Sequence, residues 1–114
     1  MDSRFFKSTD IQFKDHPKVA NVKIAILVTG KDTAATSVCL LDIAPATNIP
    51  VHTHDPQIDS IYVVSGNGQA FVNGEWKDIA AGDYIFVPAV VEHGIKNTGS
   101  ESLKLFIHHS PPLF

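Results

Sequence analysis

The sequence predicts a single all-β domain: a small antiparallel β-barrel, or double-sheet jelly roll, with few or no helices. Its 114 residues leave room for one domain rather than two. Apolar positions rarely recur at the three-and-four spacing of an amphipathic helix, and Gly or Pro interrupts the chain often. Short β-branched and aromatic runs separated by turn residues take the place of helices, and this pattern is typical of a sandwich or barrel.

Seven such runs are predicted to be strands, and the turn residues between them define the hairpins. The clearest hairpin lies at Asn73-Gly74, because both positions of its two-residue turn require a positive φ, which Asn and Gly adopt readily. Two further turns are marked by Gly66-Asn67-Gly68 and Ala81-Gly82-Asp83. The predicted strands span residues 22–28, 36–44, 60–65, 69–72, 75–79, 83–87 and 103–108.

The predicted strand near the end of the first third of the chain is apolar on both faces. One face carries Leu41 and Ile43, and the other carries Val38 and Leu40. Such a pattern indicates burial on both sides. A small closed barrel buries only its interior face, so a second covering surface is implied, and we expect a homodimer.

The charge balance and the short apolar runs exclude several classes of protein. Nine Lys and Arg residues against 12 Asp and Glu residues give a net charge of −3 with no basic run, so we expect no nucleic-acid partner. The apolar runs fall far short of the ~20 residues that span a bilayer. The first ten residues lack the apolar core of a signal peptide, so we expect a cytoplasmic protein. The single cysteine, Cys39, forms no internal disulfide, and its apolar neighbours predict an inert buried thiol.

Six histidines are many for a chain with one Met, one Trp and one Cys. Two of them form His52-Thr53-His54, and residues i and i+2 of a strand point to the same face, so both imidazoles can converge on one ion. Asp59 opens the next strand, where it either faces inward beside the histidines or caps a turn in solvent. His93 follows a later strand that ends at a proline, and it is either a third inward histidine or a surface residue.

Three imidazoles and one carboxylate make a mixed nitrogen and oxygen donor set. Such a set suits iron, manganese, nickel, zinc or copper, so we expect one divalent transition-metal ion per chain. Four protein ligands in an octahedral field leave two positions open, and an open position is typical of a catalytic site. The predicted ligands are His52, His54, Asp59 and His93.

The spacing of these residues resembles the cupin superfamily. The first motif of that family reads G-x5-H-x-H-x(3,4)-E-x6-G, and this sequence has His52-x-His54-x4-Asp59-x6-Gly66. The second motif reads G-x5-P-x-G-x2-H-x3-N, and here it is Gly82-x5-Pro88-x-Val90-x2-His93-x3-Asn97. The two motifs and their 15-residue spacer cover 46 of the 114 residues, from 52 to 97.

The resemblance implies a β-barrel of two antiparallel sheets, a metal held by the histidines and the motif carboxylate, and dimers that exchange N-terminal strands. Residues 1–20 would then form the exchanged arm. The sequence departs from the family at three positions: Asp59 replaces Glu, and Ala46 and Val90 replace glycines at turns. Because Asp is one methylene shorter than Glu, the ion is held either by Asp59 or by three histidines and water, with Gln57 as a further candidate.

The last predicted strand ends in two more histidines. Alternation places His108 on the same face as Phe106 and places His109 on the other face. One of the two is expected to point into the pocket, and His108 would do so with Phe106, as a general base or substrate contact. The alternative is that both lie at a frayed edge. His16 is expected at the surface. The predicted pocket lining is Gln57, Ile61, Val63, Phe86 and Phe106.

The open coordination sphere and the apolar pocket favour a metal-dependent enzyme that acts on a small organic molecule, with dioxygenase-like or decarboxylase-like chemistry. One alternative is a metal-dependent isomerase or epimerase of a sugar or keto acid, for which His108 is the candidate base. Another is a non-catalytic module that binds a small molecule. Fold class does not decide among these, because barrels of this kind carry many chemistries.

Overall fold

The computed structural model describes residues 1–114, and its regular secondary structure consists of strands apart from one short 3-10 turn, η1 (Ser8–Asp10). No helix in it is long and apolar enough to cross a membrane. The strands, in chain order, are β1 (Lys14–Asp15), β2 (Val22–Val28), β3 (Ser37–Ile43), β4 (Asn48–His52), β5 (Ile58–Ser65), β6 (Asn67–Val72), β7 (Glu75–Ala80), β8 (Tyr84–Val87), β9 (His93–Lys96) and β10 (Leu103–Ser110).

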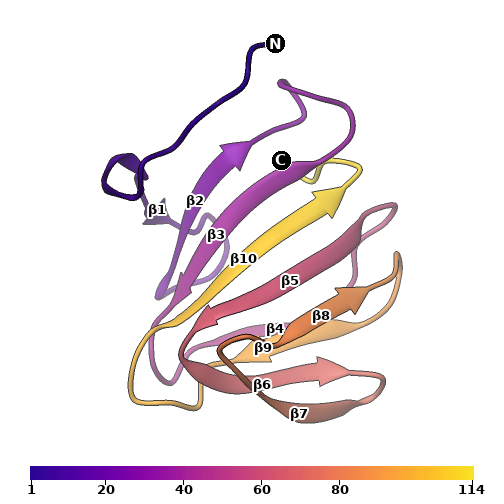
Figure 1. The fold of residues 1–114 in the computed structure, drawn as a ribbon. Helices are drawn as coiled ribbons and strands as arrows, with labels where there is room; N and C mark the ends of the chain where they lie inside the picture. The colour runs from indigo at the N-terminus through magenta and orange to yellow at the C-terminus, as the bar shows by residue number, and fades with distance from the viewer.

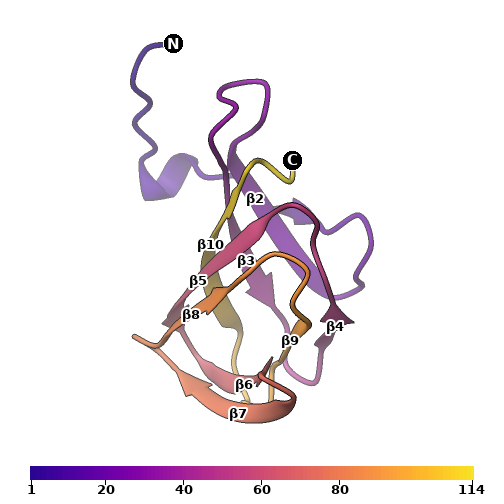
Figure 2. The same cartoon turned by 90° about the vertical axis from the view of Figure 1, so that its right-hand side faces the viewer.

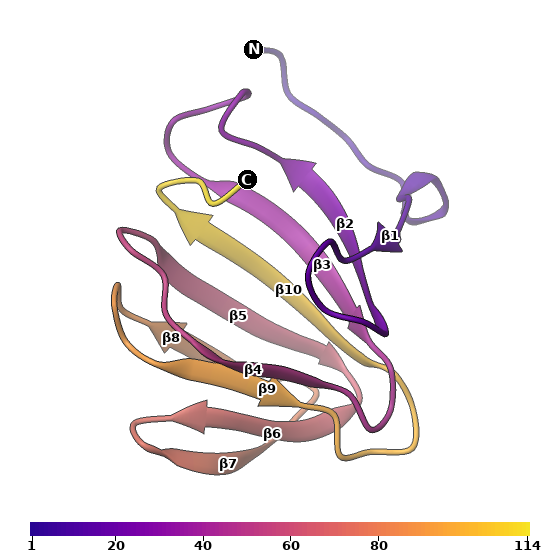
Figure 3. The same cartoon turned by 180° about the vertical axis from the view of Figure 1, so that it is seen from behind.

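The strands form two antiparallel sheets that face each other (Figure 2). The larger sheet has six strands in the order β1-β2-β3-β10-β5-β8, and the smaller has four in the order β4-β9-β6-β7. Figure 1 shows the larger sheet crossing the molecule obliquely above the smaller one, and Figure 3 shows β4 and β9 in front of β5 and β8. The predicted all-β architecture of two antiparallel sheets is confirmed.

The structure adds a strand that the sequence pattern did not reveal. Strand β4 has Pro50 at its centre, and proline has no N–H to donate to a ladder. Proline is tolerated here because β4 is an edge strand that pairs only with β9, and the pairing register shifts between Ile49 and His52, the stretch that contains Pro50. His52 is the last residue of this edge strand and therefore lies at the end of the barrel.

Turns with positive φ connect the strands. At the predicted hairpin, Asn73 has φ 53° and Gly74 has φ 84°. Two other turns place residues with a Cβ in the same left-handed region, with φ 58° at Ala46 and φ 61° at Val90. A positive φ is unfavourable for a β-branched residue. The Val90 N–H donates to the carbonyl of His54 at 2.8 Å, so this strained turn is tied directly to the histidine motif.

The core lies between the two sheets and is aliphatic. Its fully buried members include Ile24, Ile43, Val63 and Leu105. Cys39 is buried among them, and burial raises the pKa of its thiol to about 12. The thiol is therefore protonated and unreactive, as its apolar neighbours predict.

The outer face of the six-stranded sheet carries several aromatic side chains that are exposed to solvent. Phe106 of β10 pairs in register with Tyr62 of β5, which pairs with Tyr84 of β8. Phe86 is 54% exposed on the same face. On β3 the outward residues, including Val38 and Leu40, are half-buried rather than buried. We call this surface the aromatic face, made up of Tyr62, Val64, Tyr84, Phe86 and Phe106.

The N-terminal arm lies along the edge of the same sheet. Strand β1 pairs with β2 of its own chain, and Arg4 forms an ion pair with Asp32. The side chain of Phe5 is 84% exposed. The arm thus has an anchor within its own chain and leaves an apolar residue uncovered.

Candidate metal centre

Four strand ends bring a group of polar side chains together at one end of the barrel. His52 ends β4, Asp59 is the second residue of β5, His93 begins β9, and His109 is the next-to-last residue of β10. Strands β4 and β10 end where β5 and β9 begin, at the left of Figure 3. His54 joins them from the loop after β4. We call these five residues the histidine cluster.

The three histidines of the two sequence motifs meet in this cluster. The candidate ligand atoms of His52, His54 and His93 all lie within 4.8 Å of one another. Their ring centroids are 4.2 Å apart for His52 and His93, 4.8 Å for His52 and His54, and 5.2 Å for His54 and His93. The structure therefore places these three side chains next to one another at one end of the barrel.

Backbone carbonyls fix the orientation of two of these rings. Nδ1 of His52 lies 2.7 Å from the carbonyl of Pro50, and Nδ1 of His93 lies 3.1 Å from the carbonyl of Val91. A carbonyl only accepts hydrogen bonds, so both Nδ1 atoms donate to their carbonyls. Each Nε2 is then the atom left to face the cluster, and this is the arrangement that holds a histidine ligand in place.

Asp59 lies at the centre of the imidazoles and is only 4% exposed. Its Oδ2 is 3.0 Å from Nε2 of His93, 3.4 Å from Nε2 of His109 and 3.7 Å from Nε2 of His54. Burial alone would raise the pKa of Asp59. Hydrogen bonds and favourable charge interactions with His109 and His93 outweigh burial and hold that pKa well below its usual range. Asp59 therefore faces inward and is ionised.

The pKa values of three imidazoles of the cluster are shifted in different directions by their surroundings. Burial lowers the pKa of His52, and burial with the neighbouring His52 lowers the pKa of His54 to about 4. For His93 burial is outweighed by the hydrogen bonds to Asp59 and to the Val91 carbonyl, so its pKa is raised. At neutral pH, His52 and His54 are therefore neutral and have a lone pair to offer.

His109 belongs to the cluster, whereas its neighbour His108, the residue predicted to enter the pocket, does not. His109 is 5% exposed and its ring lies 5.1 Å from that of His54. His108 lies on the opposite face of β10, with its ring 6.1 Å from that of Phe106. A catalytic role for His108 remains a prediction, and the structure places this residue on the face turned away from the cluster. The inward positions of Leu105 and Ile107 were the signal that His109 also points inward.

The predicted pocket lining separates into two groups. Ile61 and Val63 share the inner face of β5 with Asp59 and are buried in the core, as alternation predicts. Phe86 and Phe106 instead lie on the aromatic face, so the expectation that they line the pocket is corrected. Gln57 is half-buried and its Nε2 donates to the carbonyl of Pro112 at 3.1 Å.

The donor set fits a divalent transition-metal ion. Three imidazole nitrogens within reach of one another suit iron, manganese, nickel, copper or zinc. A second donor group, formed by His54, Asp59 and His109, overlaps the first through His54. The two groups together comprise four imidazoles and one carboxylate, and His54 is the residue that they share.

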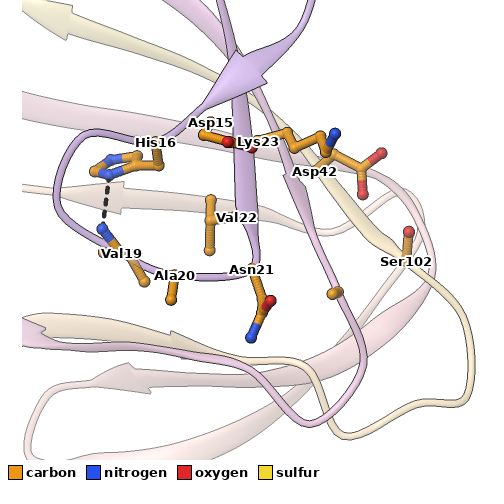
Figure 4. Close-up of a pocket in the computed structure, with 10 residues that line it drawn as sticks. Asp15, His16, Val19, Ala20, Asn21, Val22, Lys23, Asp42 and Ser102 are labelled. Carbon is orange, nitrogen blue, oxygen red and sulfur yellow. Dashed lines mark hydrogen bonds between the residues drawn. The ribbon is translucent and has the colours of Figure 1, made fainter.

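His16, the one histidine not yet described, lines a pocket near the opposite end of β10. Figure 4 shows this pocket, which has a volume of about 540 Å³ and is lined by the loop around His16, by the strand residues Lys23 and Asp42, and by Ser102, which precedes β10. Nδ1 of His16 accepts hydrogen bonds of 3.1 Å from the N–H groups of Lys18 and Val19. His16 therefore holds the loop that leads into β2 and takes no part in the cluster.

Comparison with known proteins identifies the family. A family model for the cupin domain matches residues 39–109, which is more than half of the chain. The chain therefore belongs to the cupin family. The crystal structure of a predicted oxalate decarboxylase from Thermotoga maritima shares the fold with a TM-score of 0.84, at 22% identity, covering 95% of this chain and 99% of that one.

Two curated relatives are similar in sequence. An oxalate-binding protein from Thermotoga maritima is 30% identical over 64 residues, which are 56% of this chain and 53% of that protein. A polyketide synthase from Streptomyces cyaneus is 27% identical over 111 residues, which are 86% of this chain and 72% of that protein. The match thus covers about half the length of the first relative.

Proposed function

We propose that the chain binds one divalent transition-metal ion at the histidine cluster and acts as a metal-dependent enzyme on a small organic molecule. The observation that supports this proposal is the convergence of the ligand atoms of His52, His54 and His93 within 4.8 Å. Asp59, whose Oδ2 faces the same site, is the proposed fourth ligand. The ion is iron, manganese, nickel, zinc or copper.

Such an ion supplies Lewis acidity, and an iron-like ion also supplies electrons. The residues of the chain supply the remaining functions. The Pro50 and Val91 carbonyls orient His52 and His93, and the neutral His54 adds a third donor. Ile61 and Val63 lie on the same inner face of β5 as Asp59 and are buried in the core, so the chain continues from Asp59 into an apolar interior.

The proposed reaction is dioxygenase-like or decarboxylase-like, on a small organic acid. The similarity to an oxalate-binding protein and to a predicted oxalate decarboxylase supports this substrate class. An isomerase or epimerase of a sugar or keto acid is the alternative, and it requires a base besides the metal ligands. His109 is the inward residue that supports this alternative, because it lies next to Asp59 on the inner face. A non-catalytic module would bind the same molecule without converting it.

The proposed assembly is a homodimer in which a second copy covers the aromatic face. Tyr62, Tyr84 and Phe86 are each about half exposed, and exposed aromatic groups of this kind mark sites of protein association. Exchange of the arm over residues 1–20 would add to this contact, since Phe5 is uncovered.

Metal analysis of protein purified without an affinity tag tests the proposed metal site. We expect about one equivalent per chain in the wild type and almost none in the His52→Ala, His54→Ala double variant. Substoichiometric metal that does not fall further in the double variant would end the proposal. For the dioxygenase-like reaction, the iron-loaded protein must bind nitric oxide as an oxygen analogue, and failure to do so rejects that reaction.

A further inference from the structure

The pocket beside His16 lies apart from the histidine cluster and has no part in the proposed metal site. Its volume of about 540 Å³ falls within the range of about 300–1,000 Å³ that is usual for small-molecule sites. Its walls are the loop between β1 and β2, the start of β2 and the end of β3 (Figure 4). The pocket is therefore a candidate for a second ligand site.

Backbone hydrogen bonds hold the loop of this pocket in place. The His16 N–H donates to the Val22 carbonyl at 2.8 Å, and the Ala44 N–H donates to the Asn21 carbonyl at 3.1 Å. The Val19 N–H donates to Nδ1 of His16 at 3.1 Å. The loop is thus attached to β2 on one side and to the residue after β3 on the other. Because the walls are already fixed, a ligand pays little of the cost of ordering them.

Three charged side chains of the pocket form one row across the sheet. Asp15 of β1 pairs in register with Lys23 of β2, and Lys23 pairs in register with Asp42 of β3. Side chains that are directly opposed on antiparallel strands have Cβ atoms about 5 Å apart. No ion pair joins Lys23 to either aspartate, and no hydrogen bond joins these side chains to each other in Figure 4. A positive and a negative group therefore lie side by side at the pocket, and both are free to bind a ligand.

The charge of the lining favours a ligand that carries both signs. Two aspartates and one lysine give a formal charge of −1, and burial lowers the pKa of His16, so its ring is neutral at pH 7. A ligand that is only an anion is repelled by this lining, and a ligand that is only a cation is repelled by the Lys23 ammonium group. An α-amino acid carries an ammonium and a carboxylate on one carbon atom, which matches neighbouring groups of opposite sign.

The rest of the lining is small and partly aliphatic. Val19, Ala20 and Ala44 present methyl groups to the pocket, and the side chains of Asn21 and Ser102 add neutral polar groups. Apolar walls with a few polar groups are typical of small-molecule sites. The aliphatic side chain of an amino acid would pack on these methyl groups.

We propose that this pocket binds a free α-amino acid with an aliphatic side chain, with Lys23 bound to its carboxylate and Asp42 bound to its ammonium group. The pocket lies where β10 begins and the histidine cluster where β10 ends, so the inference does not depend on the proposed metal-dependent function. Lys23 and Asp42 lie outside residues 1–20, so exchange of the N-terminal arm would leave this pair in place.

Three ligands with the same side chain show which charges the pocket recognises. L-Leucine carries both charges, N-acetyl-L-leucine carries only the carboxylate, and L-leucinamide carries only the ammonium group. We expect leucine to bind roughly three- to fivefold more tightly than either analogue, since an exposed ion pair contributes up to about 1 kcal/mol. Nuclear magnetic resonance titration of the full chain in the presence of zinc measures the three affinities. The backbone amide resonances of Val19 and Asn21 report binding at the pocket.

Variants of the charged pair assign each contact. Lys23→Gln is expected to abolish the preference for leucine over leucinamide, and Asp42→Asn the preference for leucine over N-acetyl-leucine. Lys104→Gln is the matched control, because Lys104 lies opposite Asp42 in the same row, is exposed and does not line the pocket. It should bind all three ligands as the wild type does.

Several results would overturn the inference. One is that leucine at about 10 mM shifts neither the Val19 nor the Asn21 resonance. Another is that leucine and leucinamide bind equally well to the wild type, because Lys23 then binds no carboxylate. Shifts confined to His54 and His93 would place leucine at the metal centre instead. An equal loss of preference in Lys104→Gln would show a general effect of charge rather than a contact.

Discussion

Strands β5 and β10 carry two different surfaces on their two faces. The inner face continues the aliphatic core and ends in Asp59 and His109, which are buried and face each other. The outer face carries Tyr62 and Phe106, which are exposed. Because side chains alternate along a strand, two strands supply a polar centre inside and an apolar surface outside. The polar groups of these strands are therefore concentrated inside the barrel at the proposed metal site, and the aromatic groups lie outside on the surface proposed to meet a second copy.

The largest effect is expected from breaking the inner face at His93. His93→Ala removes the partner 3.0 Å from the buried Asp59 and is expected to lower the unfolding free energy of the metal-free protein by about 3 kcal/mol. Denaturant titration at pH 7 in the presence of a chelator measures it. Glu92→Ala changes the exposed neighbour and should stay within about 0.5 kcal/mol of the wild type. If both variants are equally stable, the His93–Asp59 pair contributes nothing.

A substitution on the outer face is expected to weaken the proposed dimer without affecting metal binding on the inner face. Phe86→Asp places a charge on the aromatic face and should weaken the proposed dimer more than about 30-fold, which light scattering over a dilution series detects. Metal content should not change, because Phe86 lies outside the cluster. A wild-type protein that is monomeric at every concentration contradicts the assignment of this face to a second copy.

The shifted pKa values of His54 and His93 on the inner face make the stability of the metal-free protein depend on pH. The pKa of His54 is about 4 in the folded protein and about 6.5 when unfolded, so between these values only the unfolded chain binds the proton. Stability of the metal-free protein should therefore rise from pH 4 to pH 6.5. His93, whose pKa is raised, acts in the opposite sense, and its contribution is lost as the pH rises through that value. Thermal melts of wild type and His54→Gln measure the slope, which should flatten in the variant.

The smallest expected effect concerns the turn that supports His54. Val90 has φ 61° and its side chain is 61% exposed, so Val90→Gly removes backbone strain and little packing. We expect a gain of about 1 kcal/mol in unfolding free energy, measured by denaturant titration. Ala46→Gly, at φ 58°, should give a gain of the same sign. A loss of stability in both variants would contradict the strain assigned to these turns.

The sequence predicted most of the fold because its signals were local. The Asn73-Gly74 turn and the alternating runs predicted the hairpins, and the spacing of His52, His54 and His93 predicted that these three side chains lie close together. Strand β4 could not be predicted from the sequence pattern, because Pro50 interrupts it. The proline is tolerated because β4 lies at the edge of a sheet.

The orientation of β10 was harder to predict than its existence. Alternation shows that Phe106 and His108 share a face and that His109 lies on the other, but both faces of this strand contain large apolar residues. The pairing of β10 with β5 determines which face of β10 points inward, because His109 lies opposite Asp59. The register of β10 and β8 against β5 likewise places Phe106 and Phe86 on the outer face, and the sequence alone does not contain that register.

The most direct test of the metal centre is an anomalous-scattering map from crystals of the native protein, measured at the absorption edge of the metal found in it. We expect one peak per chain at roughly 2.0–2.2 Å from Nε2 of His52, His54 and His93. A crystal with no peak at the cluster, or with its metal bound only elsewhere on the chain, would contradict the assignment.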